Sequence, residues 1–201
     1  MGNPSPPADL NSFLAGIGHI CLQWALLEQT LLGIIAAAEN MPLEKTYTRF
    51  GTTDMMPRIR MAVRLTEEAK WPPHLRNRLK AIRTALQKEN GGLAERRNLF
   101  VHGVHEGMND QGEVRLTMVR WTAENREQVV TILDAAFLAN RLGELAQESQ
   151  SIFSDYGVWK FGPGHEVERR KHIAEAKPIT RFVRAQNIKR AVKLLFANLK
   201  P

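Results

Sequence analysis

Apolar side chains recur at three- and four-residue steps along most of this chain, which is the spacing of one face of an α-helix. The longest stripe begins near Asp9, ends near Asn40 and predicts a helix of about eight turns. Its members are Leu10, Phe13, Leu14, Ile17, Cys21, Trp24, Leu27, Leu31, Ile34 and Ala38. We expect this stripe to form one side of a hydrophobic core.

Three more helices are predicted further along the chain. One begins near Thr53 and Asp54, whose side chains can cap exposed backbone amides, and continues to about Lys70, before two prolines. The next covers 75–102 and is kinked or interrupted at Asn90-Gly91-Gly92. The last is expected over 122–153, with a core face made of Val129, Leu133, Phe137 and Leu145.

The pattern between Gly103 and Trp121 is different, because apolar positions there alternate as in a β-strand. Asn109-Asp110-Gln111-Gly112 has the composition of a turn. The sequence therefore predicts a short β-hairpin in which 104–108 pairs with 113–121. The expected fold class is mainly α, a bundle of four long helices with this hairpin between the third and the fourth.

Composition places this chain among soluble globular proteins. Its 201 residues are 43% hydrophobic and 24% charged, which suits one domain with an extension. A lone cysteine, Cys21, cannot form an intrachain disulfide, so we expect a reducing cytoplasm. Gln23, Glu28 and Gln29 interrupt the longest apolar stretches, so no membrane span is expected. The first seven residues have no basic segment followed by an apolar one, so no secretory signal is expected either. No metal-ligand spacing of cysteines and histidines is present, and neither a metal nor a cofactor is expected.

Positive charge is concentrated near the C-terminus. Residues 160–201 carry 11 Lys and Arg against 3 Asp and Glu, whereas the rest of the chain is close to neutral. Beyond Pro178 the pattern predicts an amphipathic helix whose basic residues are Arg184, Lys189, Arg190 and Lys193. These four are candidates for contacts to nucleic-acid phosphates. The same helix could instead dock on a partner protein or an anionic membrane, or remain a solvated polar tail, and membrane binding ranks last.

The richest chemistry lies in Arg97-Asn98-x-x-x-His102-Gly103, at the expected end of a helix. Arginine binds phosphate through two parallel hydrogen bonds, and histidine exchanges a proton near neutral pH. Asn98 and His102 share a helix face, but Arg97 and His102 are about 140° apart around an ideal helix. Their side chains therefore meet only through the reach of arginine, a distorted helix end, or a second protomer. If Gly103 ends the helix, the helix dipole favours a protonated His102.

This signature, with Trp24-x-x-x-Glu28 in a long first helix, resembles the HEPN superfamily. The resemblance covers residues 9–153. It leaves a disordered N-terminus at 1–8 and a basic extension at 154–201. It implies a HEPN-like four-helix bundle that forms homodimers and cleaves RNA without a metal, the ribose 2′-hydroxyl attacking the neighbouring phosphate.

By the same resemblance, Arg97 holds the phosphate, His102 transfers a proton and Asn98 orients one or the other. Glu28 and His105 are candidates to line the same cleft, Glu28 by pairing with Arg97 or with another arginine. The alternatives are purely structural roles: His102 caps carbonyls at the helix end, Arg97 makes a surface ion pair, and Glu28 and His105 are solvated.

Two classes of function remain open at this point. The first is a metal-independent endoribonuclease of the toxin or defence type, restrained by a regulatory or antitoxin protein. The second is a non-catalytic module that binds nucleic acid or nucleotide, or scaffolds a complex. For this second class the resemblance suggests a nucleotidyltransferase-like partner.

Overall fold

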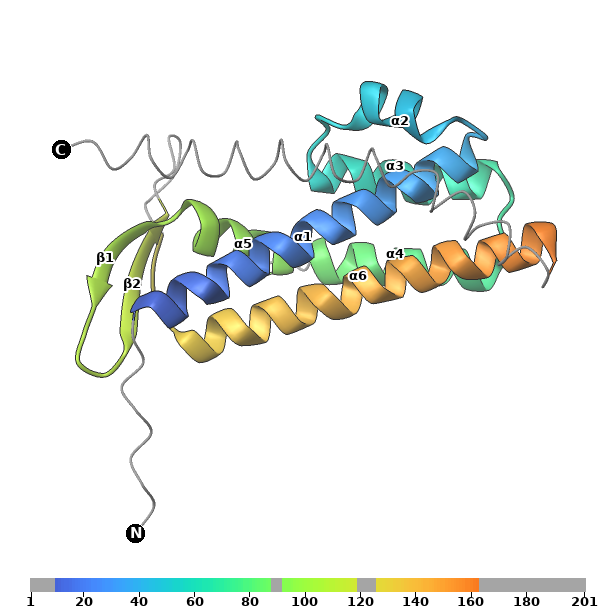
Figure 1. The fold of residues 1–201 in the computed structure, drawn as a ribbon. Coiled ribbons are helices and arrows are strands. Elements are labelled where there is room, and N and C mark those ends of the chain that lie inside the picture. Colours follow the sequence, from blue (N-terminus) through green and yellow to red (C-terminus); the bar gives the residue numbers. More distant parts are fainter. Residues whose placement is uncertain (1–9, 88–91, 119–125, 163–201) are drawn as a thin grey trace, which may run out of the picture. The chain divides into compact units, whose positions relative to one another are not determined.

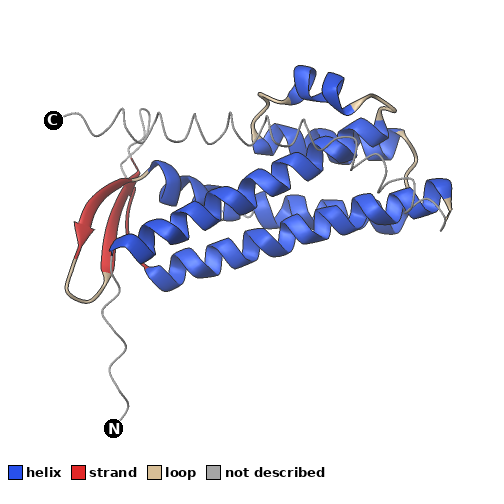
Figure 2. Ribbon diagram, viewed as in Figure 1, coloured by secondary structure: helices blue, strands red, loops and turns tan. Residues whose placement is uncertain are grey.

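A computed structural model describes residues 10–87, 92–118 and 126–162 of the chain. This part is mainly helical and contains one three-stranded antiparallel sheet (Figures 1 and 2). The elements are, in order, α1 (Leu10–Ala38), α2 (Leu43–Phe50), α3 (Met55–Glu68), α4 (Pro73–Gln87), α5 (Leu93–His102), β1 (Val104–Met108), β2 (Glu113–Met118), β3 (Arg126–Thr131) and α6 (Ile132–Phe161). All packing described below lies within the unit Met1–Tyr156, because Gly157–Pro201 is a separate unit. The expected limit between 8 and 9 and the four basic residues of the C-terminal helix lie outside the described residues, whereas the expected limit between 153 and 154 falls within α6.

Helix α1 confirms the long first helix and supplies much of the core. Its fully or nearly buried side chains include Phe13, Ile20, Leu27, Leu31 and Ile34. The predicted stripe was only partly right, however, since Leu10 and Leu14 are each 49% exposed. Apolar residues occupy nearly the whole circumference of α1, so periodicity alone does not identify the buried face. The helix also has the length and hydropathy of a membrane-spanning segment, a property that buried core helices share.

Helices α3, α4 and α5 lie where the sequence predicted them, and one further short helix, α2, is present. The short helix α2 was not predicted, and only Thr46 and Phe50 of its residues are buried. Helix α3 occupies the predicted range, with Asp54 at its N-cap position, although the Asp54 side chain makes no capping hydrogen bond. Asn40 and Lys70, near which the first two predicted helices were to end, have the left-handed φ values of 51° and 53°. Such residues end helices by turning the chain out of the helical path.

The predicted interruption and hairpin are both confirmed. α4 ends at Gln87 and α5 begins at Leu93, on either side of the expected break. β1 pairs with β2 in antiparallel register, with His105 opposite Leu116. Residues 119–121, the end of the predicted second strand, lie outside the described residues.

A third strand replaces the predicted beginning of the last helix. β3 pairs with β2 along its whole length, and the helix begins only at Ile132. The reason is a reciprocal cap: the backbone amide of Thr131 donates to Asp134 Oδ2 (2.9 Å), and the amide of Asp134 donates to Thr131 Oγ1 (3.3 Å). The β-branched run Val129-Val130-Thr131 also suits a strand better than a helix.

The predicted core face of this last helix was wrong at three of its four residues. Val129, Leu133 and Phe137 are 53%, 75% and 53% exposed, whereas the half-buried Leu145 packs against the core as expected. The buried face is instead made of Ala135, Leu138, Ala139, Leu142, Ala146, Ser149, Ile152 and Tyr156. Its small residues allow α6 to lie alongside α1 (Figure 1), close enough that a Cβ on Gly16 would be 3.0 Å from the Cβ of Ala135.

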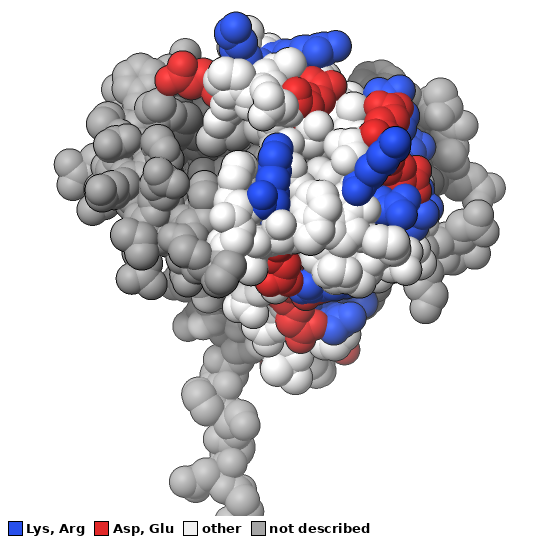
Figure 3. Space-filling model, turned by 90° about the vertical axis from the view of Figure 1, so that its right-hand side faces the viewer, with Lys and Arg blue, Asp and Glu red and all other residues white. Residues whose placement is uncertain are grey.

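Charged side chains at the end of the helical unit away from the sheet are mixed in sign. Figure 3 shows basic and acidic groups interspersed on this face. Arg78, for example, donates to Glu148 and Asp155 at 2.6 Å each, and Lys80 pairs with Glu67. The face therefore presents no single-sign patch among its described residues.

Candidate functional site

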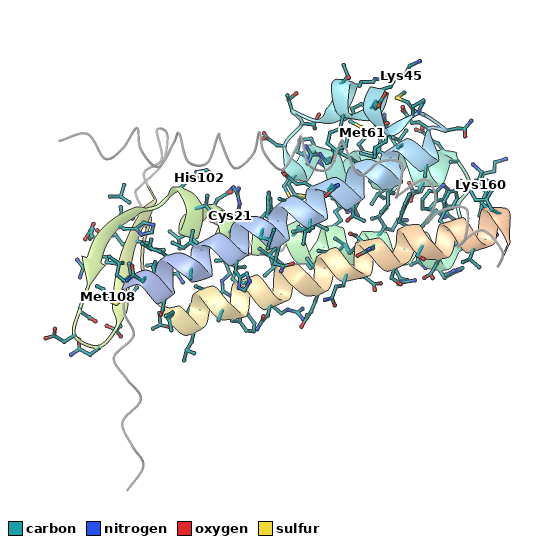
Figure 4. All side chains as sticks on the ribbon, in the orientation of Figure 1. Cys21, Lys45, Met61, His102, Met108 and Lys160 are labelled. Atoms are coloured by element: carbon teal, nitrogen blue, oxygen red, sulfur yellow. The ribbon has the colours of Figure 1, made fainter. Side chains whose placement is uncertain are left out.

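The end of α5 brings the three signature side chains together within one chain. Arg97 Nη1 donates to Asn98 Oδ1 (3.0 Å) and lies 3.1 Å from His102 Nε2. The length of the arginine side chain thus overcomes the angular separation of Arg97 and His102 without a second protomer. Asn98 and His102 are exposed, whereas Arg97 is half-buried (Figure 4 labels His102).

Helix α1 forms the other side of this cluster. The Arg97 guanidinium lies 5.0 Å from the centre of the Trp24 ring, in cation–π geometry. Cys21, one turn earlier on α1 and labelled in Figure 4, is close enough to interact electrostatically with Arg97. Burial raises the pKa of the Cys21 thiol, and the Arg97 charge acts in the opposite direction. Arg97 is therefore held between an aromatic face on α1 and the imidazole on α5.

Glu28 joins this cluster by way of Trp24. Trp24 Nε1 donates to Glu28 Oε1 at 3.2 Å, and the same oxygen lies 3.3 Å from Nη1 of Arg58. Of the two pairings predicted for Glu28, the ion pair with another arginine is the one observed. Its charge still acts on Arg97, whose pKa it raises, whereas partial burial of Arg97 lowers that pKa more strongly.

Burial and charge act together on His102. Partial desolvation lowers the pKa of His102, and the adjacent Arg97 guanidinium lowers it further. Both effects lower the pKa and so oppose the protonated imidazole expected from the helix dipole, desolvation being the larger and the Arg97 charge 3.1 Å from Nε2 adding to it. A neutral ring protonated on Nδ1 leaves Nε2 free to accept the Arg97 hydrogen bond.

Gly103 occupies the predicted C-cap position with an extended backbone, φ −66° and ψ 146°, rather than a left-handed one. Its amide donates to the Leu99 carbonyl oxygen at 2.9 Å, and a Cβ at this position would overlap that oxygen. The glycine is therefore needed for close approach at the helix end and not for a positive φ.

Other predicted site residues are elsewhere. The His105 ring packs edge-on against Phe13, with 5.9 Å between ring centres, and the structure shows no contact between His105 and the Arg97 cluster. Arg184, Lys189, Arg190 and Lys193 lie outside the described residues. Within 10–87, 92–118 and 126–162, no three His, Cys, Asp or Glu side chains are grouped as metal ligands would be.

Sequence reasoning missed Arg58 altogether. It is 2% exposed, and its Nη2 donates to the carbonyl oxygens of Phe50 (3.4 Å), Gly51 (3.1 Å) and Thr53 (2.5 Å). The available signal was its position in α3, where Met55, Ile59, Ala62 and Val63 predict a buried face that also includes residue 58.

Comparison with known proteins adds no relative, since no family model, no curated protein and no solved structure matches the chain.

Proposed function

We propose that this protein is a HEPN-like, metal-independent endoribonuclease whose reacting groups are Arg97 and His102. The observation that carries the proposal is the 3.1 Å contact between Arg97 Nη1 and His102 Nε2 at an exposed helix end, with Asn98 on the same guanidinium. A phosphate binding there would meet a fixed positive charge and a proton-accepting nitrogen side by side. The combination of helices and a hairpin directly after α5 is consistent with a HEPN-like bundle.

The lowered pKa of His102 assigns it the role of general base. When the phosphate takes the hydrogen bond that Arg97 otherwise donates to His102, Nε2 of the neutral imidazole is free to remove the proton of the ribose 2′-hydroxyl. The O2′–P bond then forms and the P–O5′ bond breaks. Arg97 stabilises the negative charge that develops on the phosphate oxygens. The products are a 2′,3′-cyclic phosphate and a 5′-hydroxyl, the leaving oxygen taking its proton from a water molecule on the opposite side of the phosphate.

A homodimer would supply that opposite side. The segment from Leu10 to Leu27 contains no Lys, Arg, Asp or Glu, and Leu22 and Leu26 on its outer face are 45% and 43% exposed. Trp24 and Cys21, which contact or act on Arg97, belong to this same helix. Pairing of two copies through α1 would cover apolar surface and bring two Arg97–His102 pairs near one cleft.

The second candidate is a non-catalytic module that binds an anionic group of RNA or nucleotide, acting with a regulatory protein. It is favoured by the fact that Arg97 Nη1 is already engaged by Asn98 and His102 within one chain. A cluster satisfied in this way could bind phosphate without transferring a proton. The antitoxin or nucleotidyltransferase-like partner and the cytoplasmic location remain predictions from the sequence.

RNA cleavage in the presence of EDTA separates the two candidates. We expect the wild-type protein to release 2′,3′-cyclic phosphate ends, and Arg97→Ala and His102→Ala to lower the rate by about 10²–10³-fold. Arg141→Ala and His74→Ala, which change exposed residues of α6 and α4, are matched controls and should leave the rate unchanged. Undiminished cleavage by both site variants would reject the nuclease, whereas RNA binding without cleavage would favour the module.

A further inference from the structure

A continuous series of contacts connects the loop after α2 with the end of α5. It runs from Arg58 to Glu28, from Glu28 to Trp24, and from Trp24 to Arg97. Its members come from α3, α1 and α5, so the series links three helices.

Arg58 is the fixed end of this series. Its guanidinium is buried and held by the carbonyl oxygens of Phe50, Gly51 and Thr53 through one nitrogen, Nη2. The other terminal nitrogen, Nη1, faces Glu28 and has no other partner among the described residues. A buried guanidinium bound in this way has one orientation, because moving it would leave buried polar groups without partners.

Glu28 transmits that orientation to the aromatic ring. One carboxylate oxygen, Oε1, lies 3.3 Å from Arg58 Nη1 and accepts the indole N–H of Trp24 at 3.2 Å. The contact with Arg58 is an ion pair without a hydrogen bond, whereas the contact with Trp24 is a hydrogen bond to a charged acceptor. The Trp24 ring is 7% exposed, so packing and this single hydrogen bond together determine its plane.

The ring in turn forms one wall for the Arg97 guanidinium. The buried Nε of Arg97 has no hydrogen-bond partner among the described residues, and Arg97 is held by Trp24 on one side and by Asn98 and His102 on the other. The orientation of the indole therefore decides whether Nη1 reaches His102.

We propose that Arg58, acting through Glu28 and Trp24, is a positioning residue that fixes the Arg97 guanidinium against His102. The inference deepens the proposed function and rests on it for its biological meaning. The geometry it asserts, however, is measurable without RNA.

The test follows the His102 imidazole by NMR through a pH titration of the full chain. Arg97→Ala removes the neighbouring positive charge, so the pKa of His102 should rise. The size of this rise is the reference for the other variants. Arg58→Lys, which keeps the charge but loses the multiple bonds to carbonyls, should give at least half of that rise. Trp24→Phe, which keeps an aromatic face but loses the donor to Glu28, should move the pKa in the same direction.

Glu28→Gln separates positioning from simple electrostatics by the sign of its effect. Loss of a negative charge by itself favours the neutral imidazole and would lower the pKa of His102. Release of Arg97 from its fixed position would raise it. We expect a rise, since Arg97 is the charged group that acts directly on His102, and Glu28 and Cys21 from α1 act on Arg97.

Arg78→Lys is the matched control, because Arg78 also makes several bonds to acidic side chains but joins α4 to α6. It should leave the pKa of His102 unchanged. The proposal is overturned if Trp24→Phe and Glu28→Gln both leave the pKa of His102 at the wild-type value. It is also overturned if Glu28→Gln lowers that pKa. Should Arg58→Lys fail to fold, these two variants decide the question. If the pKa of His102 rises in Arg58→Lys, Trp24→Phe and Glu28→Gln but the wild-type protein cleaves no RNA, the nuclease is rejected and this inference stands.

Discussion

Replacing Arg58 by methionine tests how much the contacts of this buried arginine contribute to the free energy of unfolding. Methionine fills a similar volume, so the substitution removes the charge and its hydrogen bonds without opening a large cavity. The carbonyl oxygens of Gly51 and Thr53 would lose their Arg58 donor, that of Phe50 would keep only the Thr53 amide, and Glu28 would lose its cationic partner. Arg58→Met is therefore unlike replacing both members of a buried pair, which is often neutral.

The expected cost is large for a single residue. The side chain of Arg58 is 3% exposed, and hydrogen bonds from a charged group contribute about 1.5–3 kcal/mol each. Water can replace only part of what the Gly51 and Thr53 carbonyl oxygens and the 33% exposed Glu28 side chain would lose, so Arg58→Met should cost about 3–4 kcal/mol. Arg78, whose side chain is 31% exposed, makes ion pairs that are screened by water, so Arg78→Met should cost only about 1 kcal/mol.

Urea unfolding followed by tryptophan fluorescence measures both numbers. With an m-value of about 2 kcal/mol/M, Arg58→Met should lower the midpoint by roughly 2 M, with little change in m. Equal midpoints for Arg58→Met and Arg78→Met would refute the reasoning, because burial would then not distinguish the two arginines.

Three other predictions follow from the structure. Because the pKa of His102 is lowered and its neutral form is the base, cleavage should rise with pH and level off at a lower pH than an ordinary histidine gives; an inflection at or above the ordinary value in the kcat/KM profile would contradict this. Leu22→Glu should convert a dimer to monomers in sedimentation velocity while leaving the thermal stability of the fold nearly unchanged; an unaltered sedimentation coefficient counts against pairing through α1. Gly16→Val should lower the free energy of unfolding by about 1–3 kcal/mol, since even a Cβ is tight against α6, whereas Gly18→Ala, in open space, should raise it by up to about 1 kcal/mol; similar effects of both would contradict the close approach of the two helices.

Local signals predicted the fold where the sequence spacing was unambiguous. The long α1, the break before α5 and the hairpin all follow from periodicity and turn composition, and all are present. The beginning of α6 was misplaced because Thr131-x-x-Asp134 was not recognised as a cap. The core face was misjudged for a separate reason: large apolar residues were taken as core, whereas the buried face of α6 includes the small residues Ala135, Ala139 and Ala146.

The candidate site was predictable only as far as one helix extends. Arg97, Asn98 and His102 lie within six residues, so α5 alone places them at one helix end, although the contact between Arg97 and His102 also depends on where the arginine side chain lies. The pairing of Glu28 with Arg58 joins residues from different helices and depends on the packing of α1 against α3. The lowered pKa of His102 likewise depends on where the Arg97 side chain settles against Trp24, which no local pattern records.

A double-mutant cycle on RNA cleavage tests most directly whether Arg97 and His102 act on the same phosphate. The rates of the wild-type protein, Arg97→Ala, His102→Ala and the double variant would be compared under single-turnover conditions. Residues that work as one unit have strongly non-additive effects, so the double variant should be about as slow as the slower single variant. Rate losses that simply multiply would contradict a shared phosphate, because each side chain would then be acting independently of the other.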